Sequence, residues 1–563
     1  ILANTIRPPR PEGMPAWKDL SDKERAFQER LMEVYAGFLE HTDVQVGKVI
    51  DELEARGIRD NTVVIYILSD NGASAEGMGG SVAELNAQNA IPTTVEEHIA
   101  VAEQLGGLEA IGGPKMDNMY HSAWAWAGDS PFRYTKLIAA DWRGTRTPMV
   151  VSWPNRIKPD DTPRPQFTHV NDVVPTLYEI LGIQPPRVVD GFEQDPIDGV
   201  SFAHTFDAAD APESNTTQYF ECLGSRGIYH EGWMASTFGP RTPWVAQMPD
   251  LANWDPMQDK WELFNTRRDY SLMQDLAAEE PEKLEDLKAL FMRVAEENKV
   301  LPIGGGLLGP LNPQEMKRST NTEWTLFEGM TRIPESQAPN VRNGNVRAEI
   351  EAEVTENANG VIFALGGYAG GVSLYALDGE LYYEYSALLL KRDKIKVGKL
   401  PTGEVKIDFE MRTPLERAAP AEVRFWINGK EAATGTVQRT VPGTFTASET
   451  FDVGMDTCSP VADGYFDEAP FKFEGKLKQL DFKNKLTEII NLIHEAEDIS
   501  EIIVNIRPRI LDMMDCERLS IFAVDAANQQ VYSLFKAGDE VKEIRVPRST
   551  GSMVGFVALT GQT

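Results

Sequence analysis

The chain has 563 residues, 42% of them hydrophobic, which is enough for more than one domain with its own core. Its formal net charge of −31 argues against a nucleic acid or an anionic membrane surface as partner, because both would repel it. No apolar run reaches the roughly 18 residues of a membrane span. The three cysteines are too few and too scattered for a disulfide framework or a zinc site, and they leave the compartment undecided.

The first predicted element is a long helix. Ser21 and Glu24 have the spacing of a capping box, and Gly57 is a stop signal. This helix leads into a strand, which is the arrangement of an α/β domain. The apolar positions at helical spacing, which we expect to face a sheet, are Phe27, Leu31, Val34 and Phe38.

The strand over residues 63–69 is almost wholly apolar or aromatic and rich in β-branched residues. This pattern predicts a strand buried on both faces inside a parallel sheet. Asp70, Asn71 and Gly72 follow at its carboxyl end, where ligands bind in open α/β sheets. A carboxylate beside an amide offers two hard oxygen ligands for Ca²⁺ or Mg²⁺, although the same residue types also form plain turns.

Further elements follow along the chain. Residues 147–153 predict a second strand, and residues 172–181 predict the helix after it, which ends at Gly182. Residues 281–298 predict a polar amphipathic helix. Residues 300–343 are rich in Gly, Pro and Asn, and they predict a linker or a loosely packed crossing segment.

Beyond this segment the apolar residues alternate with charged ones. Val405, Ile407 and Phe409 show the period of two, and the pairs Asp378-Gly379 and Asn428-Gly429 are strong hairpin turns. Residues 345–480 therefore predict a β-sandwich.

The last 80 or so residues change character again. Residues 519–524 and 530–535 predict a strand pair. Residues 544–558 resemble the first half of a GAF domain, a sensory module, and the chain ends before such a domain would be complete. The sequence leaves open whether this fusion is natural. An amphipathic helix is predicted from Leu486, Ile489, Ile490 and Ile493.

From about Pro11 to Leu276 the chain resembles the arylsulfatases, a branch of the alkaline phosphatase superfamily. Six segments match in order, and they are residues 32–36 (MEVYA), 63–72 (VVIYILSDNG), 144–148 (GTRTP) with Trp153-Pro154, 169–177 (HVNDVVPTL), 198–202 (DGVSF) and 261–265 (WELFN). The resemblance implies an incomplete alkaline-phosphatase-like sheet with flanking helices. We expect this α/β portion over residues 1–300, the linker over 301–344, the sandwich over 345–481 and the partial GAF-like α+β segment over 482–563.

The resemblance also implies a chemistry, the hydrolysis of a sulfuric ester of a small molecule. In this family a cysteine of a Cys-x-Pro-x-Arg motif becomes formylglycine, whose hydrate attacks sulfur, and Ca²⁺ holds the nucleophile and the sulfate oxygens. Asp70 and Asn71 match the second pair of metal ligands, with Ca²⁺ favoured over Mg²⁺. Residues 131–136 (PFRYTK) resemble the segment that carries a sulfate-binding lysine, so Lys136 is the expected catalytic cation.

Other polar and aromatic residues are weaker candidates for the mouth of the site. His121 could line it, but no family histidine matches this position and a structural histidine is the simpler interpretation. Trp124 could stack on an aryl group, although packing within the domain is more common for such a residue. Arg143 could add positive potential.

The chain departs from the family pattern at the nucleophile. Cys222 and Arg226 have the right spacing but Gly224 stands where Pro is expected, and the segment after Cys458 ends in Ala462 where Arg is needed. The chain also opens without Met, so we expect the nucleophile, the first metal ligands and the first strands to lie upstream of Ile1. This chain alone is then expected to bind metal poorly and to lack turnover.

Two alternative functions stay open at this stage. One is a phosphate or phosphonate ester hydrolase of the same superfamily, which would use the same Asp-Asn pair. The other is a non-enzymatic sensor that binds a small ligand through its GAF-like end. The natural substrate, the oligomeric state and the compartment are not encoded in any motif that we recognise.

Overall fold

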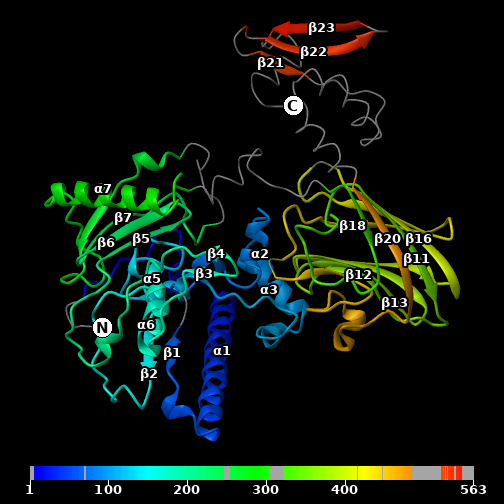
Figure 1. Ribbon diagram of the computed structural model, residues 1–563. Helices are drawn as coiled ribbons and strands as arrows, with labels where there is room; N and C mark the ends of the chain where they lie inside the picture. The colour runs from blue at the N-terminus through cyan, green and yellow to red at the C-terminus, as the bar shows by residue number, and fades with distance from the viewer. Residues whose placement is uncertain are drawn as a thin grey trace. The chain divides into compact units, whose positions relative to one another are not determined.

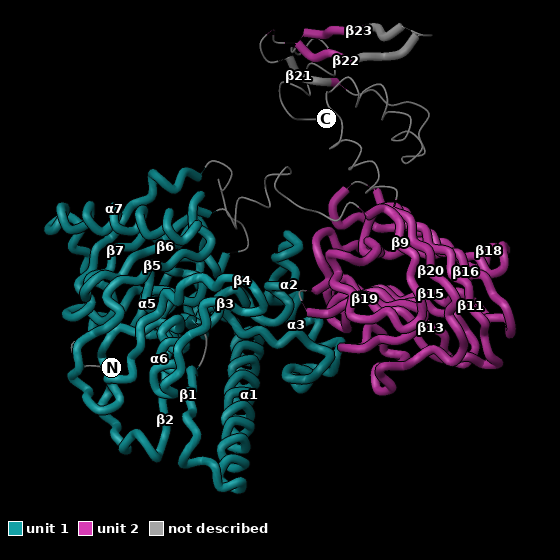
Figure 2. Tube along the Cα trace, in the orientation of Figure 1, with its two compact units in different colours: residues 1–316 teal, residues 317–563 magenta. Residues whose placement is uncertain are grey.

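The computed structural model describes residues 5–68, 71–245, 254–304, 321–414, 416–446 and 448–484, together with short stretches between 522 and 547. The chain divides into two compact units, residues 1–316 and residues 317–563 (Figure 2). Among the helices of these described stretches, none combines the length and apolarity that crossing a bilayer needs.

The first unit mixes helices with small sheets (Figure 1). Its helices are α1 (Asp22–Ala55), α2 (Ala83–Gln88), α3 (Val95–Gln104), α4 (Ser122–Asp129), α5 (Trp142–Thr145), α6 (Val173–Leu181) and α7 (Pro281–Glu297). Its strands are β1 (Val64–Ile67), β2 (Met149–Ser152), β3 (Val188–Val189), β4 (Phe192–Glu193), β5 (Thr217–Cys222), β6 (Ser225–His230), β7 (Trp233–Thr237) and β8 (Glu262–Asn265).

Helix α1 begins and ends where the sequence predicts. Both hydrogen bonds of the capping box between Ser21 and Glu24 are present, and Gly57 has a left-handed φ of 67° after the last turn. Phe27 and Leu31 are fully buried, but Phe38 is 66% exposed. The prediction that Phe38 faces a sheet is therefore wrong. Other described residues pack against the first turns of this helix and leave Phe38 exposed.

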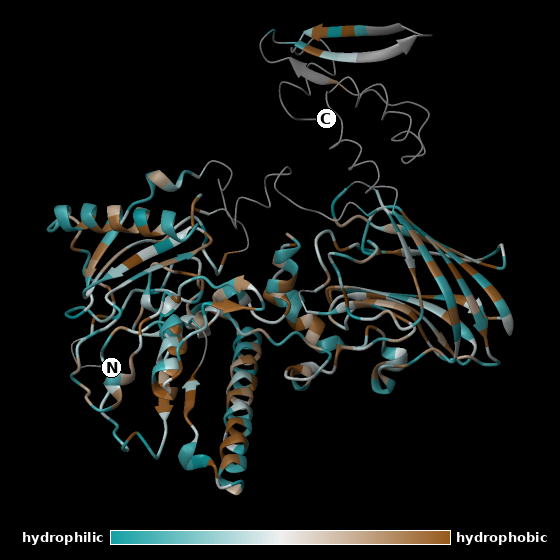
Figure 3. Cartoon of the chain, in the orientation of Figure 1, coloured by the Kyte–Doolittle hydropathy of each residue, from teal (hydrophilic) through white to brown (hydrophobic). Residues whose placement is uncertain are grey.

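Strand β1 has the predicted position but not the predicted partner. It pairs antiparallel with β2, with Ile65 opposite Val151, and these two strands form a sheet of their own. Both strands are apolar (Figure 3), yet Ile67 and Val150 are exposed. The predicted burial of β1 on both faces in a parallel sheet is thus wrong for the described chain. An apolar run favours burial, but the segments that would bury it and the direction of the paired strand depend on the rest of the fold.

The sheet β5-β6-β7-β8 is antiparallel and has a hydrophobic cluster on each face. Helix α7 covers one face, where Leu287 and Phe291 pack on Ile228 and Leu263. The opposite face packs on aromatic side chains, and this second cluster contains Phe132, Trp142, Tyr229, Met234, Phe264 and Leu272. The predicted helices over 172–181 and 281–298 are confirmed as α6 and α7.

The second unit contains two six-stranded sheets that are antiparallel throughout. The first sheet has the order β10 (Ile333–Pro334), β19 (Thr450–Val453), β12 (Gly360–Gly366), β13 (Gly371–Leu377), β14 (Glu380–Ala387) and β15 (Lys391–Lys399). The second has the order β18 (Lys430–Val437), β17 (Ala421–Ile427), β16 (Gly403–Arg412), β11 (Val346–Val354), β20 (Gly475–Asn484) and β9 (Glu323–Leu326).

Aromatic side chains join these two sheets. Phe363 of one sheet lies 6.3 Å from Phe409 and 5.5 Å from Phe482 of the other, measured between ring centroids. The hairpin turns at Asp378-Gly379 and Asn428-Gly429 are confirmed, with positive φ at all four residues. Strands β9 and β10 lie inside the segment predicted as a linker, and β20 runs past residue 481.

The end of the chain is described only in part. Strands β21 (Ala523–Asp525), β22 (Gln530–Ala537) and β23 (Glu540–Pro547) form an antiparallel sheet. The predicted helix over residues 486–493 lies outside the described residues, and the GAF resemblance stays a prediction.

A buried acid in the second unit makes stability depend on pH. Asp456 is 2% exposed and accepts hydrogen bonds from the amide of Val461 and the hydroxyl of Tyr465, whose oxygen also forms a hydrogen bond with the hydroxyl group of Ser373. Burial raises the pKa of Asp456 to about 7. In the unfolded chain this carboxyl group has an ordinary pKa of 3.8 and loses its proton at a lower pH than in the folded chain. The free energy of unfolding therefore falls as the pH rises from about 4 to about 7.

The variant Asp456→Asn should keep both accepted hydrogen bonds and lose this dependence. We expect it to be more stable than the parent above neutral pH, on the order of 2 kcal/mol, and little changed near pH 4. Thermal unfolding across this pH range measures the difference. Asp467→Asn, an exposed acid close by in the chain, is the control. Parallel pH profiles for Asp456→Asn and the parent would contradict the assignment.

Candidate functional site

The loop after β1 is held by a close backbone approach. Gly72 has a φ of 95°, and a Cβ atom placed on it would lie 2.2 Å from the carbonyl oxygen of Arg143. Gly77 makes the same kind of contact, with its ideal Cβ 2.2 Å from the carbonyl oxygen of Tyr120. Only glycine fits at either position. Asn71 is exposed at the start of this loop, and Asp70 lies outside the described residues.

A buried carboxylate connects this loop to Arg143. Asp129, at the end of α4, accepts hydrogen bonds from the amide of Ala73 at 3.1 Å and from Nε of Arg143. Asp129 is 1% exposed, so this ion pair is screened only weakly by solvent. Arg143 is therefore tied to the loop by its side chain as well as by its carbonyl group.

Lys136 contacts the same loop. Its amide donates to the carbonyl oxygen of Ala73 at 3.1 Å. Its ammonium lies 3.9 Å from Oε2 of Glu76, and its side chain is 32% exposed. The structure thus links Lys136 directly, and Arg143 through Asp129, to Ala73 in the loop that starts at Asn71.

Glu76 is the acidic centre of this region, and sequence analysis missed it. It sits in the short helix η3 (Ala75–Gly77), whose first turn is capped by the hydroxyl of Ser74. Its Oε1 accepts from Arg241 at 2.5 Å. No sequence motif pointed to this pair, because Arg241 is far from Glu76 in the chain and only folding brings them together.

Burial and neighbouring charges shift the pKa values of acidic groups near Glu76. The pKa of Glu84 is raised by burial and by the charge of Glu76, while Lys136 and Arg241 act against that rise. Burial raises the pKa of Asp117 to about 7, and the charge of Glu84 adds to it. Cys222 is half-buried, and burial raises the pKa of its thiol, so a reactive thiolate is disfavoured at neutral pH.

His121 and Trp124 have structural contacts. Nδ1 of His121 accepts from the amide of Ala123 at 2.9 Å and so caps α4. Burial lowers the pKa of His121 to about 4, so the ring is neutral at pH 7. The indole of Trp124 donates to the carbonyl oxygen of Gln28 at 3.0 Å and lies 5.6 Å from the ring of Trp17. These contacts favour packing over substrate binding for both residues.

The described residues do not complete a calcium site. Ca²⁺ takes about six to eight oxygen ligands. Asn71 offers one amide oxygen, while Asp129 is paired with Arg143 and Glu76 with Arg241. Within the described ranges, no three His, Cys, Asp or Glu side chains lie together in a way that could hold a metal ion.

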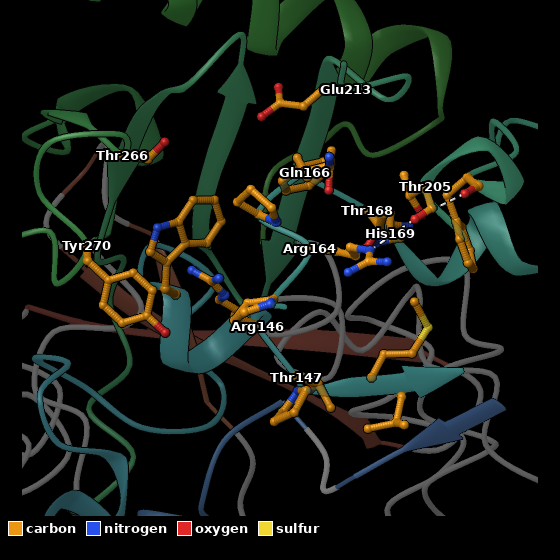
Figure 4. Close-up of a pocket in the computed structure, with 18 of the residues that line it drawn as sticks. Arg146, Thr147, Arg164, Gln166, Thr168, His169, Thr205, Glu213, Thr266 and Tyr270 are labelled. Atoms are coloured by element: carbon orange, nitrogen blue, oxygen red, sulfur yellow. Dashed lines mark hydrogen bonds between the residues drawn. The ribbon is translucent and has the colours of Figure 1, made fainter. Parts of the chain in front are cut away.

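A large cavity lies beyond the Arg143 segment, with a volume of about 1420 Å³ (Figure 4). Arg146 stacks on Tyr270, its guanidinium carbon 4.7 Å from the ring centroid, and Nε of Arg164 donates to the carbonyl oxygen of Thr205. Arg143 lines this cavity, whereas Lys136 and Asn71 do not. Much of the remaining wall is aromatic and consists of Phe132, Trp142, Phe167, Phe202, Phe206, Phe220 and Tyr229.

Comparison with known proteins agrees with the resemblance seen in the motifs. Residues 10–183 match the sulfatase family model. An uncharacterised sulfatase of Schizosaccharomyces pombe is 30% identical over 278 residues, which are 49% of this chain and 45% of the relative. An arylsulfatase of Klebsiella aerogenes is 26% identical over 188 residues, which are 33% of this chain and 37% of the relative. The chain spans less than half the length of these curated relatives.

Similarity to solved structures is weaker. A protein of glycosaminoglycan metabolism from Bacteroides thetaiotaomicron is 19% identical with a TM-score of 0.29, covering 45% of this chain and 42% of that chain.

The close approach at Gly72 gives a sharp test of the loop. Gly72→Ala should destabilise the first unit by about 3 kcal/mol or more, because the new methyl group overlaps a backbone oxygen that cannot rotate away. Gly57→Ala is the matched control, since Gly57 also has a positive φ but open space around it, and should cost only about 1 kcal/mol. Denaturant unfolding measures both. If the two variants lose the same free energy of unfolding, the close contact with Arg143 does not contribute to the effect of Gly72→Ala.

Proposed function

Since residues 10–183 form a sulfatase-family segment, we propose that this chain is part of a sulfuric ester hydrolase of the arylsulfatase type. Both curated relatives described above are sulfatases, which favours a sulfate ester over a phosphate or phosphonate ester as substrate. The substrate class is then a small molecule that carries one esterified sulfate.

Lys136 is the residue of this chain that we assign to sulfate. The observation that supports it is its position, with its amide bound to Ala73 beside the Asn71 loop and its ammonium partly exposed. Attack on a sulfate ester places negative charge on oxygen atoms, both around sulfur and on the leaving group. An ammonium fixed next to these oxygens stabilises that charge, and it does so more strongly where water is partly excluded.

Asp70 and Asn71 are assigned to a divalent metal, Ca²⁺ in preference to Mg²⁺. Together they offer two oxygen ligands, which is too few for tight binding of Ca²⁺. The assignment rests on the sequence match at residues 63–72, and no step of the reaction is derived from it.

We expect the purified chain to release no nitrophenol from nitrophenyl sulfate, with or without added Ca²⁺. The physical reason is that the sequence contains no Cys-x-Pro-x-Arg motif to supply the nucleophile. Absorbance of free nitrophenolate measures the release, with Lys136→Met as the background control. Turnover by the parent above that background would contradict this part of the proposal.

Sulfate binding can be tested without turnover. Inorganic sulfate should slow the acylation of Lys136 by acetic anhydride, because a bound anion stabilises the unreactive ammonium and covers it. Lys288 is the internal control, since it has a similar exposure of 35% and also faces a glutamate. Chloride at equal ionic strength controls for screening. Peptide mass spectrometry gives both rates. Equal slowing of Lys136 and Lys288 would count against the assignment of Lys136.

A further inference from the structure

Glu76 lies between two cations that come from distant parts of the chain. Oε1 of Glu76 is 2.5 Å from Nη2 of Arg241, and Oε2 is 3.9 Å from Nζ of Lys136. The side chain of Glu76 is only 15% exposed. Each carboxylate oxygen therefore faces a different cation, and solvent screens the group only in part.

We propose that Glu76 is the positioning residue for Lys136, and that Arg241 is a second cation of the same sulfate-binding face. This inference rests on the proposed function and extends it by two residues. Glu76 would act only through Lys136, whereas Arg241 would contact the sulfate group directly.

An aromatic cluster fixes the two cation-bearing loops side by side. Tyr134 lies 4.7 Å from Phe238 and 6.4 Å from Trp244 between ring centroids. Tyr134 is two residues before Lys136, and Arg241 lies between Phe238 and Trp244. The indole of Trp244 also donates to the carbonyl oxygen of Glu12 at 2.9 Å, which anchors the loop at its far end. The juxtaposition of Lys136 and Arg241 is thus built into the packing.

The two distances assign different roles to the two cations. Arg241 is hydrogen-bonded to Glu76, so that carboxylate fixes its orientation. The ammonium of Lys136 is too far from Oε2 for a hydrogen bond but close enough for an ion pair. Glu76 can therefore hold the ammonium of Lys136 in place without accepting a hydrogen bond from it. The N–H donors of Lys136 stay available to an oxyanion.

The charge balance suits a singly charged ester. Lys136 and Arg241 carry two positive charges against one on Glu76. Among the described residues, Glu84 on α2 and Cys222 at the end of β5 also interact electrostatically with these charges, and burial raises the pKa of both groups. Among Glu76, Lys136 and Arg241 alone, two positive charges against one negative charge leave one net positive charge, and the raised pKa of Glu84 makes its carboxylate form less favoured beside them.

A purely structural role for Glu76 would be to anchor the loop of Arg241. The acylation rate of Lys136 separates the two roles, because an ammonium that is paired with a carboxylate is less accessible to the reagent than an unpaired one. In Glu76→Gln we expect Lys136 to be acylated faster than in the parent, by about 2- to 10-fold near pH 8, relative to Lys288. In Arg241→Met we expect slower acylation, because Glu76 then faces Lys136 alone.

Both variants are compared by thermal unfolding to show that they fold. If Glu76→Gln fails to fold, Arg241→Met decides, together with Arg241→Lys, which keeps the charge and should restore the parent rate. Unchanged reactivity of Lys136 in the folded variants would overturn the positioning role. The second claim predicts that inorganic sulfate protects Lys136 several-fold less in Arg241→Met than in the parent, and equal protection would overturn it.

The positioning role of Glu76 and the assignment of Lys136 to sulfate can fail independently of each other. If sulfate protects Lys136 in the parent but Glu76→Gln changes nothing, the proposed function stands and the positioning role is wrong. If Glu76→Gln changes the acylation rate but sulfate protects no variant, Glu76 controls Lys136 and the assignment of Lys136 to sulfate is wrong.

Discussion

The candidate site depends on one steric constraint, the passage of residues 72–77 between two other backbone segments. Gly72 touches the carbonyl of Arg143, and Gly77 touches the carbonyl of Tyr120, at distances that leave no room for a side chain. Because both ends of this short stretch are fixed, Glu76 has a defined position between them. The placement of Lys136, Arg143 and Arg241 follows from that position through contacts with Ala73, Asp129 and Glu76.

Electrostatics then distinguishes Arg143 from Arg241. Arg143 is paired with a fully buried carboxylate and lines the aromatic cavity, so its charge is committed to holding the loop. Arg241 is paired with a partly exposed carboxylate that it shares with Lys136. The second arrangement leaves positive charge facing solvent, which is what the binding of an anionic ester requires.

The second unit is stabilised by different means. Its two sheets join through aromatic rings such as Phe363 and Phe409, and the sequence alternation that predicts the sandwich is the same pattern that fills this interface. Polar groups buried beside it are hydrogen-bonded, as Tyr465 is to Asp456 and Ser373. Burial raises the pKa of Asp456, so this unit is expected to be more stable in mildly acidic than in neutral solution.

Local patterns determined the ends of α1, the helices α6 and α7, and the hairpins at Asp378-Gly379 and Asn428-Gly429, because caps and turns depend on neighbours in the chain. Motif order also predicted the similarity to sulfatases that the family model matches over residues 10–183. The antiparallel partner of β1, the exposure of Phe38 and the Glu76–Arg241 pair were decided only by the tertiary structure. Each depends on which distant segment lies alongside, and neither periodicity nor spacing contains that information.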